Sequence, residues 1–193
     1  MKRFNTIVPL LVVLLIFTLV SCSPVQITGL KQWNFTDSST SLTKYLFPDE
    51  DFLSCFEYLD GDYHYFDNCK PWDHLEVAIA FTEYEDEVYL KAKQYCFDNM
   101  LLSEYNRIEY NGYVFVETLE LPRDYKHLED GKNTNYPYHM NMFAYNDSLN
   151  RLVFLGFYCS VEGEDKADII KTDFGAFLET YYSEYYDFGT SIN

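Results

Sequence analysis

The stretch Leu152-Val153-Phe154-Leu155-Gly156-Phe157-Tyr158 carries no charged residue and is apolar on both sides of an extended chain. A strand with one face in water alternates apolar and polar residues, whereas a strand covered on both faces is a continuous apolar run. The stretch therefore predicts a central strand of a sheet that is covered on two sides.

Other strands are predicted on either side of this run. Asn111-Gly112 separates two strand-like segments and is a strong hairpin signal, because both residues of such a turn take positive φ. The segment 75–81 places its large apolar residues on one face, with the small Ala78 and Ala80 on the other, where a helix can approach closely. The predicted strands are 63–66, 75–81, 107–110, 113–121, 138–145 and 151–159, which make a sheet of about five to six strands.

Two helices are predicted, at about 83–100 and 166–182. Thr82-Glu83-Tyr84-Glu85 has the spacing of a capping box before the first helix. Asp165 or Glu164 is the predicted N-cap of the second. Together with the strands, these helices predict an α+β fold in which an antiparallel sheet carries both helices on one face.

The N-terminus has the features of an export signal. Met1-Lys2-Arg3 is basic, residues 6–20 are apolar apart from Pro9, and Leu19-Val20-Ser21-Cys22 narrows to a small residue before a cysteine. The apolar run is shorter than the roughly 20 residues of a membrane-spanning helix. An ordinary signal peptide that ends near a cysteine, or an uncleaved anchor helix, are the alternatives.

Residues 1–22 resemble the bacterial lipoprotein signal with its lipobox. This resemblance implies that the Cys22 thiol receives a diacylglyceryl group and that residues 1–21 are removed. The protein would then be exported and held by its lipid at the cell surface, facing outwards. If the host is Gram-negative, Ser23 is compatible with sorting to the outer membrane.

The remaining chain is expected to form one domain. A Ser/Thr-rich segment, 22–43, is predicted to be a tether, followed by a single ectodomain, 44–186, and a loose tail, 187–193. The acidic, tyrosine-rich composition of the ectodomain resembles that of small lipoproteins of Gram-positive gut bacteria that have no assigned activity. The resemblance therefore implies no reaction or ligand.

The charge of the mature chain excludes some partners. Removal of residues 1–21, which contain Lys2 and Arg3, reduces the basic residues from 14 to 12 against 31 acidic ones, a formal charge of −19. Such a surface repels nucleic acid and anionic lipid headgroups. We therefore expect no nucleic-acid partner, and attachment to the membrane only through the lipid on Cys22.

Aromatic residues make up 19% of the chain. They are spread along the sequence rather than clustered, which favours their use in the core and on strand faces over a platform for sugars or peptides.

Four cysteines follow Cys22, namely Cys55, Cys69, Cys96 and Cys159. Disulfides are permitted in an exported protein. Cys55 and Cys69 enclose a short polar loop and are the preferred local pair. Cys96 and Cys159 fall in predicted regular elements and are either bridged or buried thiols.

Two groups of residues are candidate metal ligands. The set Cys55, His64, Cys69 and His74 lacks the tight C-x₂₋₄-C spacing of zinc knuckles, so a loop disulfide is preferred there. A weak calcium candidate surrounds Gly61, although its spacing is not that of an EF-hand. Its members are Glu57, Asp60, Asp62 and Asp67.

The sequence contains no Gly-x-Ser-x-Gly elbow, glycine-rich phosphate loop or His-Glu-x-x-His motif. We therefore expect no catalytic residues, no enzymatic activity and no cofactor. The expected function is a lipid-anchored cell-surface protein whose ectodomain binds an unidentified extracellular ligand or protein. The alternative is an immunity or inhibitor-type lipoprotein that binds a basic protein partner.

Overall fold

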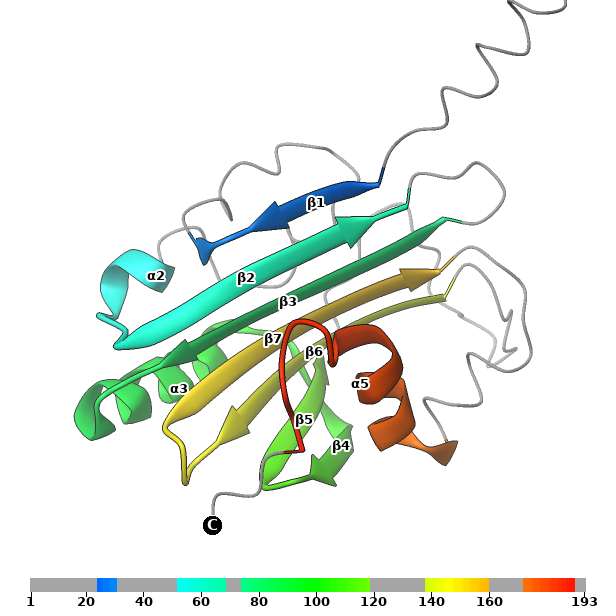
Figure 1. Ribbon diagram of the computed structural model, residues 1–193. Coiled ribbons are helices and arrows are strands. Elements are labelled where there is room, and N and C mark those ends of the chain that lie inside the picture. The colour runs from blue at the N-terminus through cyan, green and yellow to red at the C-terminus, as the bar shows by residue number, and fades with distance from the viewer. Residues whose placement is uncertain (1–23, 31–51, 69–73, 119–137, 160–171, 190–193) are drawn as a thin grey trace, which may run out of the picture.

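A computed structural model describes residues 24–30, 52–68, 74–118, 138–159 and 172–189 (Figure 1). In these residues the protein is an α+β fold built on one open antiparallel sheet. The strands are β1 (Val25–Thr28), β2 (Asp60–Asp67), β3 (Leu75–Glu83), β4 (Leu102–Tyr110), β5 (Tyr113–Thr118), β6 (Tyr138–Asn146) and β7 (Arg151–Cys159). The helices are α2 (Phe52–Cys55), α3 (Asp86–Asn99) and α5 (Phe174–Tyr182).

The sheet has the order β1-β2-β3-β7-β6-β5-β4, so β7 is its central strand, as the apolar run predicts. Each strand pairs antiparallel with the next strand in the chain, except that β3 pairs with β7 instead of β4. The turn between β4 and β5 is confirmed, because Asn111 and Gly112 have φ values of 47° and 78°. The described residues contain seven strands, more than the five or six expected.

The two long helices cover opposite faces of the sheet, which corrects the prediction that both lie on one face. Figure 1 shows α5 in front of the sheet and α3 behind it. Leu155 of β7 belongs to the core under α5, whereas Phe154 belongs to the core under α3. The physical reason is the apolar run itself, since successive side chains of a strand point to opposite faces and both sets must be buried.

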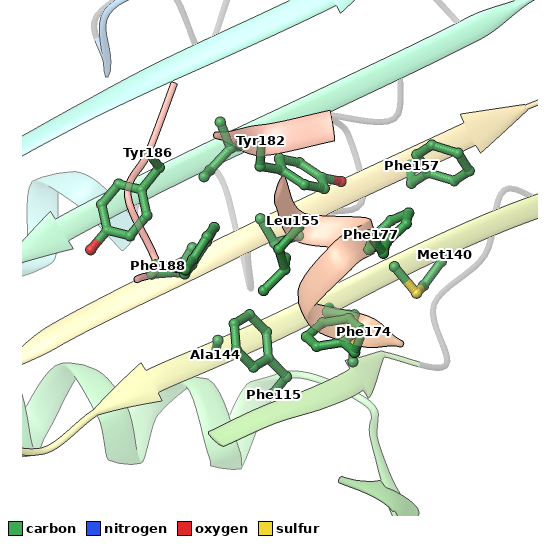
Figure 2. Close-up of a cluster of buried hydrophobic side chains, with 14 of the residues drawn as sticks. Phe115, Met140, Ala144, Leu155, Phe157, Phe174, Phe177, Tyr182, Tyr186 and Phe188 are labelled. Carbon is green, nitrogen blue, oxygen red and sulfur yellow. The ribbon is translucent and has the colours of Figure 1, made fainter. Parts of the chain in front are cut away.

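The core under α5 is rich in aromatic rings (Figure 2). Phe174 and Phe177 of α5 face Phe115 of β5 and Phe157 of β7, with ring centroids 4.8 Å and 5.1 Å apart for the pairs 115–174 and 157–177. The chain after the helix joins this core, because Phe188 is buried and its ring lies 5.6 Å from that of Phe115. A loose tail was predicted from residue 187, but Phe188 instead closes the core; residues 190–193 lie outside the described residues.

The core under α3 uses small residues of β3 as predicted. Ala78 and Ala80 are fully buried beneath the helix residues Tyr89, Ala92 and Cys96. The short helix α2 adds Phe52, which is also fully buried.

The segment predicted to be a tether contributes to the fold. Residues Val25–Thr28 form the edge strand β1, and Leu30 is buried beside β2. Gly61 of β2 allows this close approach, because a Cβ there would lie 2.8 Å from Leu30 Cδ1 and 2.7 Å from the Phe81 carbonyl oxygen. Signal residues 1–21 and Cys22 lie outside the described residues. Within the described ranges, no helix is long and apolar enough to span a membrane.

Both long helices begin later than predicted. β3 continues to Glu83, so the predicted capping box at 82–85 is not formed and Glu85 precedes α3 without a side-chain cap. The non-helical Asp173 caps α5, where its Oδ1 accepts a hydrogen bond of 3.0 Å from the Ala176 amide. The prediction of one continuous helix over 166–182 is therefore wrong, because residue 173 is not helical. Residues 166–171 and the predicted caps Glu164 and Asp165 lie outside the described ranges.

Candidate functional site

A row of polar side chains crosses one end of the sheet. The strand registers place Val25 opposite Asp67, Asp67 opposite Glu76, Glu76 opposite Tyr158, and Tyr158 opposite His139. Residues directly opposite one another point to the same face. The row therefore lies on the same face as α3, beyond the apolar core that this helix covers.

Two carboxylates and one imidazole converge within this row. His74, which directly precedes β3, places its Nε2 3.1 Å from Asp67 Oδ1 and 2.9 Å from Glu76 Oε1. The three atoms all lie within 4.8 Å of one another. The Glu76 side chain is only 5% exposed and that of His74 32%, so the group opens to solvent mainly on the histidine side.

The chain geometry holds the three groups in place. Asn68, which follows Asp67, donates a backbone hydrogen bond of 3.1 Å to the Leu75 carbonyl oxygen. In return, the Leu75 amide donates a hydrogen bond of 2.8 Å to Asn68 Oδ1. This reciprocal pair joins the two chain segments, and each of the three converging side chains belongs to a residue directly next to Asn68 or Leu75.

The imidazole is also positioned by an aromatic ring. The centroids of His74 and Tyr158 lie 4.9 Å apart, with the ring planes inclined at 61°. Such an edge-to-face contact favours one orientation of the histidine ring. The result is a group with two acceptor carboxylates and an oriented ring nitrogen at the ends of two paired strands.

No family model, curated protein or solved structure matches this chain. The chemistry of the site is therefore inferred from its own geometry.

A second histidine extends the polar row towards the middle of the sheet. His139 of β6 is partly buried, and this burial lowers its pKa to about 4, although a hydrogen bond with Asn141 opposes the shift. Its imidazole is therefore neutral at neutral pH. Asn141 is fully buried on the same face.

The structure does not assemble the calcium candidate. Asp60 and Asp67 stand at opposite ends of β2, which at about 3.3 Å per residue separates them by roughly 23 Å. Asp60 Oδ1 accepts from the Gly61 amide, and Asp62 Oδ2 lies 3.1 Å from His64 Nε2. Glu57 is exposed in the loop before the strand. Only Asp67 belongs to the converging group.

The structure describes three of the four cysteines that follow Cys22. Cys96 is buried on the inner side of α3, whereas Cys159 is buried on the opposite face of the sheet, so these two thiols cannot form a disulfide with each other. The sequence left open whether Cys96 and Cys159 are bridged or are buried thiols. The structure describes both as buried thiols. Cys55 is exposed in α2, and its expected partner Cys69 lies outside the described residues.

The mixed cysteine and histidine set is not assembled either. His64 points to the α5 face of β2, where its ring stacks on Tyr185 with centroids 4.9 Å apart. His74 instead joins Asp67 and Glu76 on the other face. Sequence reasoning missed Glu76, although a lone carboxylate between Leu75 and Val77 in an otherwise apolar strand was a usable signal.

Proposed function

We propose that this chain is a lipid-anchored protein of the cell exterior whose folded domain binds a ligand and catalyses no reaction. The lipobox-like stretch Leu19-Val20-Ser21-Cys22 supports the anchor. The structural observation that carries the proposal is the position of β1, which begins at Val25, three residues after Cys22. At about 3.5 Å per residue, the anchor would lie within roughly 10 Å of the sheet.

This spacing would keep one end of the sheet close to the membrane. The end of the sheet where β1 begins also contains Asp67, Glu76 and His139, because the register aligns these residues with Val25. The polar row is thus the part of the described domain nearest the anchor, and a ligand bound there would be held close to the bilayer surface.

Lipid labelling tests the anchor. Cells that express the full chain are grown with an alkyne-tagged fatty acid, and membranes are separated from the soluble fraction. The wild-type chain is expected to be labelled and to sediment with membranes, whereas Cys22→Ala should remain unlabelled and uncleaved. Cys55→Ser is the matched control. Of the cysteines that the structure describes, Cys55 is the exposed one, and its replacement should not affect labelling. Persistent labelling of Cys22→Ala would overturn the proposal.

The second candidate is an immunity or inhibitor-type lipoprotein with a basic protein partner. The observation in its favour is the exposed acidic surface, which includes Glu85, Asp86 and Glu87 at the start of α3. An acidic field accelerates association with a basic protein and weakens steeply with salt. Capture from host extracts at low and high salt separates the candidates: loss of the partner at high salt favours the inhibitor class, and salt-insensitive capture of a neutral glycan or peptide favours the first.

A further inference from the structure

We infer that Asp67, His74 and Glu76 form a binding site for a divalent transition-metal ion such as Zn²⁺. This inference does not depend on the lipid anchor. It rests on the convergence of one imidazole nitrogen and two carboxylate oxygens from three residues, of which one carboxylate is almost completely buried.

The spacing of the three atoms suits metal coordination. Ligands held about 2.1 Å from a metal are separated by about 3.0 Å when they stand at right angles and by about 3.4 Å in the tetrahedral geometry of zinc. The distances from His74 Nε2 to the carboxylates of Asp67 and Glu76 are 3.1 Å and 2.9 Å. The two carboxylate oxygens lie within 4.8 Å of each other, so a metal ion would contact all three atoms after a small adjustment of the side chains. A single Nε2–H, in contrast, cannot align with two acceptors.

The charges of the two carboxylates also favour a bound cation. Glu76 and Asp67 bring two carboxylates together, and Glu76 is buried at the end of a strand whose next residues on that face are Ala78 and Ala80. Two carboxylates held in one group repel each other, and a cation bound between them offsets this repulsion. A divalent ion balances the charge of both carboxylates and accepts the lone pair of an imidazole nitrogen.

The donor set selects the class of ion. Ca²⁺ and Mg²⁺ prefer oxygen ligands alone, whereas a mixed set of imidazole and carboxylate suits Zn²⁺ and related transition metals. Three protein ligands from the described residues leave room for a water molecule or part of a ligand. The reciprocal hydrogen bonds of Asn68 and Leu75 hold the ligands in position before the metal binds.

The protein offers a matched control in a second histidine–carboxylate pair. His64 Nε2 lies 3.1 Å from Asp62 Oδ2, close to the spacing of His74 and Asp67, but on the other face of β2. It does not belong to a group of three metal-ligating side chains in the described part of the chain. His64 therefore controls for the weak binding of a metal by a single histidine–carboxylate pair.

The test is calorimetric titration of the metal-free full chain in detergent with Zn²⁺, after exposed thiols are blocked with iodoacetamide. One equivalent should bind to the wild type and to His64→Ala, with at least tenfold weaker binding to His74→Ala and Glu76→Gln. Circular dichroism checks that each variant is folded. If Glu76→Gln does not fold, Asp67→Asn is tested in its place. Equal binding by the His64→Ala and His74→Ala variants, or no binding by the wild type, would overturn the site.

Cobalt spectroscopy provides a second, direct readout. Co²⁺ bound by the imidazole and carboxylates should give visible d–d absorption bands that Zn²⁺ displaces and that are lost in His74→Ala. An ion pair between a protonated His74 and the two carboxylates would give no such bands, and that result would contradict the inference. Preference for Ca²⁺ over Zn²⁺ would contradict the assignment of the ion class.

Discussion

Arg151 at the start of β7 donates a hydrogen bond to the carboxylate of Glu83 at the end of β3. The same guanidinium donates to the hydroxyl groups of Tyr113 and Tyr186, which also share a hydrogen bond of 2.6 Å. These contacts join three strands of the sheet to the segment that follows α5. The C-terminal segment is therefore held by a charged network as well as by its aromatic rings.

Loss of this arginine should destabilise the fold. Arg151→Met leaves the half-buried Glu83 carboxylate without its charged donor, and we expect a loss of about 2–3 kcal/mol in the free energy of unfolding. Arg107→Met is the matched control, because Arg107 is exposed on β4 and its replacement should change stability by less than about 0.5 kcal/mol. Urea denaturation followed by circular dichroism measures both. Equal effects would refute the role assigned to the network.

Phe188 should contribute to stability as a core residue. Its ring lies 4.6 Å from Tyr186 and 5.4 Å from Tyr113, and it is almost fully buried. Phe188→Ala should lower the free energy of unfolding by about 3 kcal/mol, since it removes apolar contacts and leaves a cavity. Leu90→Ala removes a large side chain that is mostly exposed and should cost far less. A negligible effect of Phe188→Ala would restore the prediction of a loose tail.

Stability should depend on pH through His139. Its pKa is about 4 in the folded protein and about 6.5 in the unfolded chain. The unfolded chain therefore binds more protons between these values, so stability is full above pH 6.5 and declines as the pH falls towards 4. From pH 7 to pH 5 this group should account for a loss of about 2 kcal/mol.

His139→Gln removes this titration, and its free energy of unfolding should fall less than that of the wild type over the same interval. The difference between the two proteins isolates the contribution of His139 from that of other groups. Parallel pH profiles from urea denaturation would show that His139 is accessible to protons in the folded state.

Cys96 and Cys159 should not be linked to each other. They are buried on opposite faces of the sheet, beyond the range in which Cβ atoms can be bridged. After mild reduction, Cys55 is expected to react with iodoacetamide in the native protein, while Cys96 and Cys159 should react only in denaturant. Mass spectrometry of peptides identifies the modified sites. A cross-linked 96–159 peptide from unreduced protein would contradict the two-core arrangement.

Some of the candidate site was accessible from the sequence, but its assembly was not. Asp67 and His74 were each singled out, in different sets, because acidic and imidazole side chains are visible in the sequence. Their convergence with Glu76 depends on the register of β2 and β3, in which Asp67 lies opposite Glu76. A shift of one residue would turn one of these carboxylates to the other face. Spacing along the chain cannot supply this information.

The sequence by itself determined the elements whose signals are local. The apolar run from Leu152 to Tyr158 requires cover on both faces, and Asn111-Gly112 has the backbone freedom that a tight hairpin needs. Only the tertiary structure decided that α3 and α5 take opposite faces, that Val25–Thr28 joins the sheet and that Phe188 closes a core. Periodicity and turn preference act over a few residues, whereas these placements depend on contacts between segments far apart in the chain, which form wherever they bury the most apolar surface.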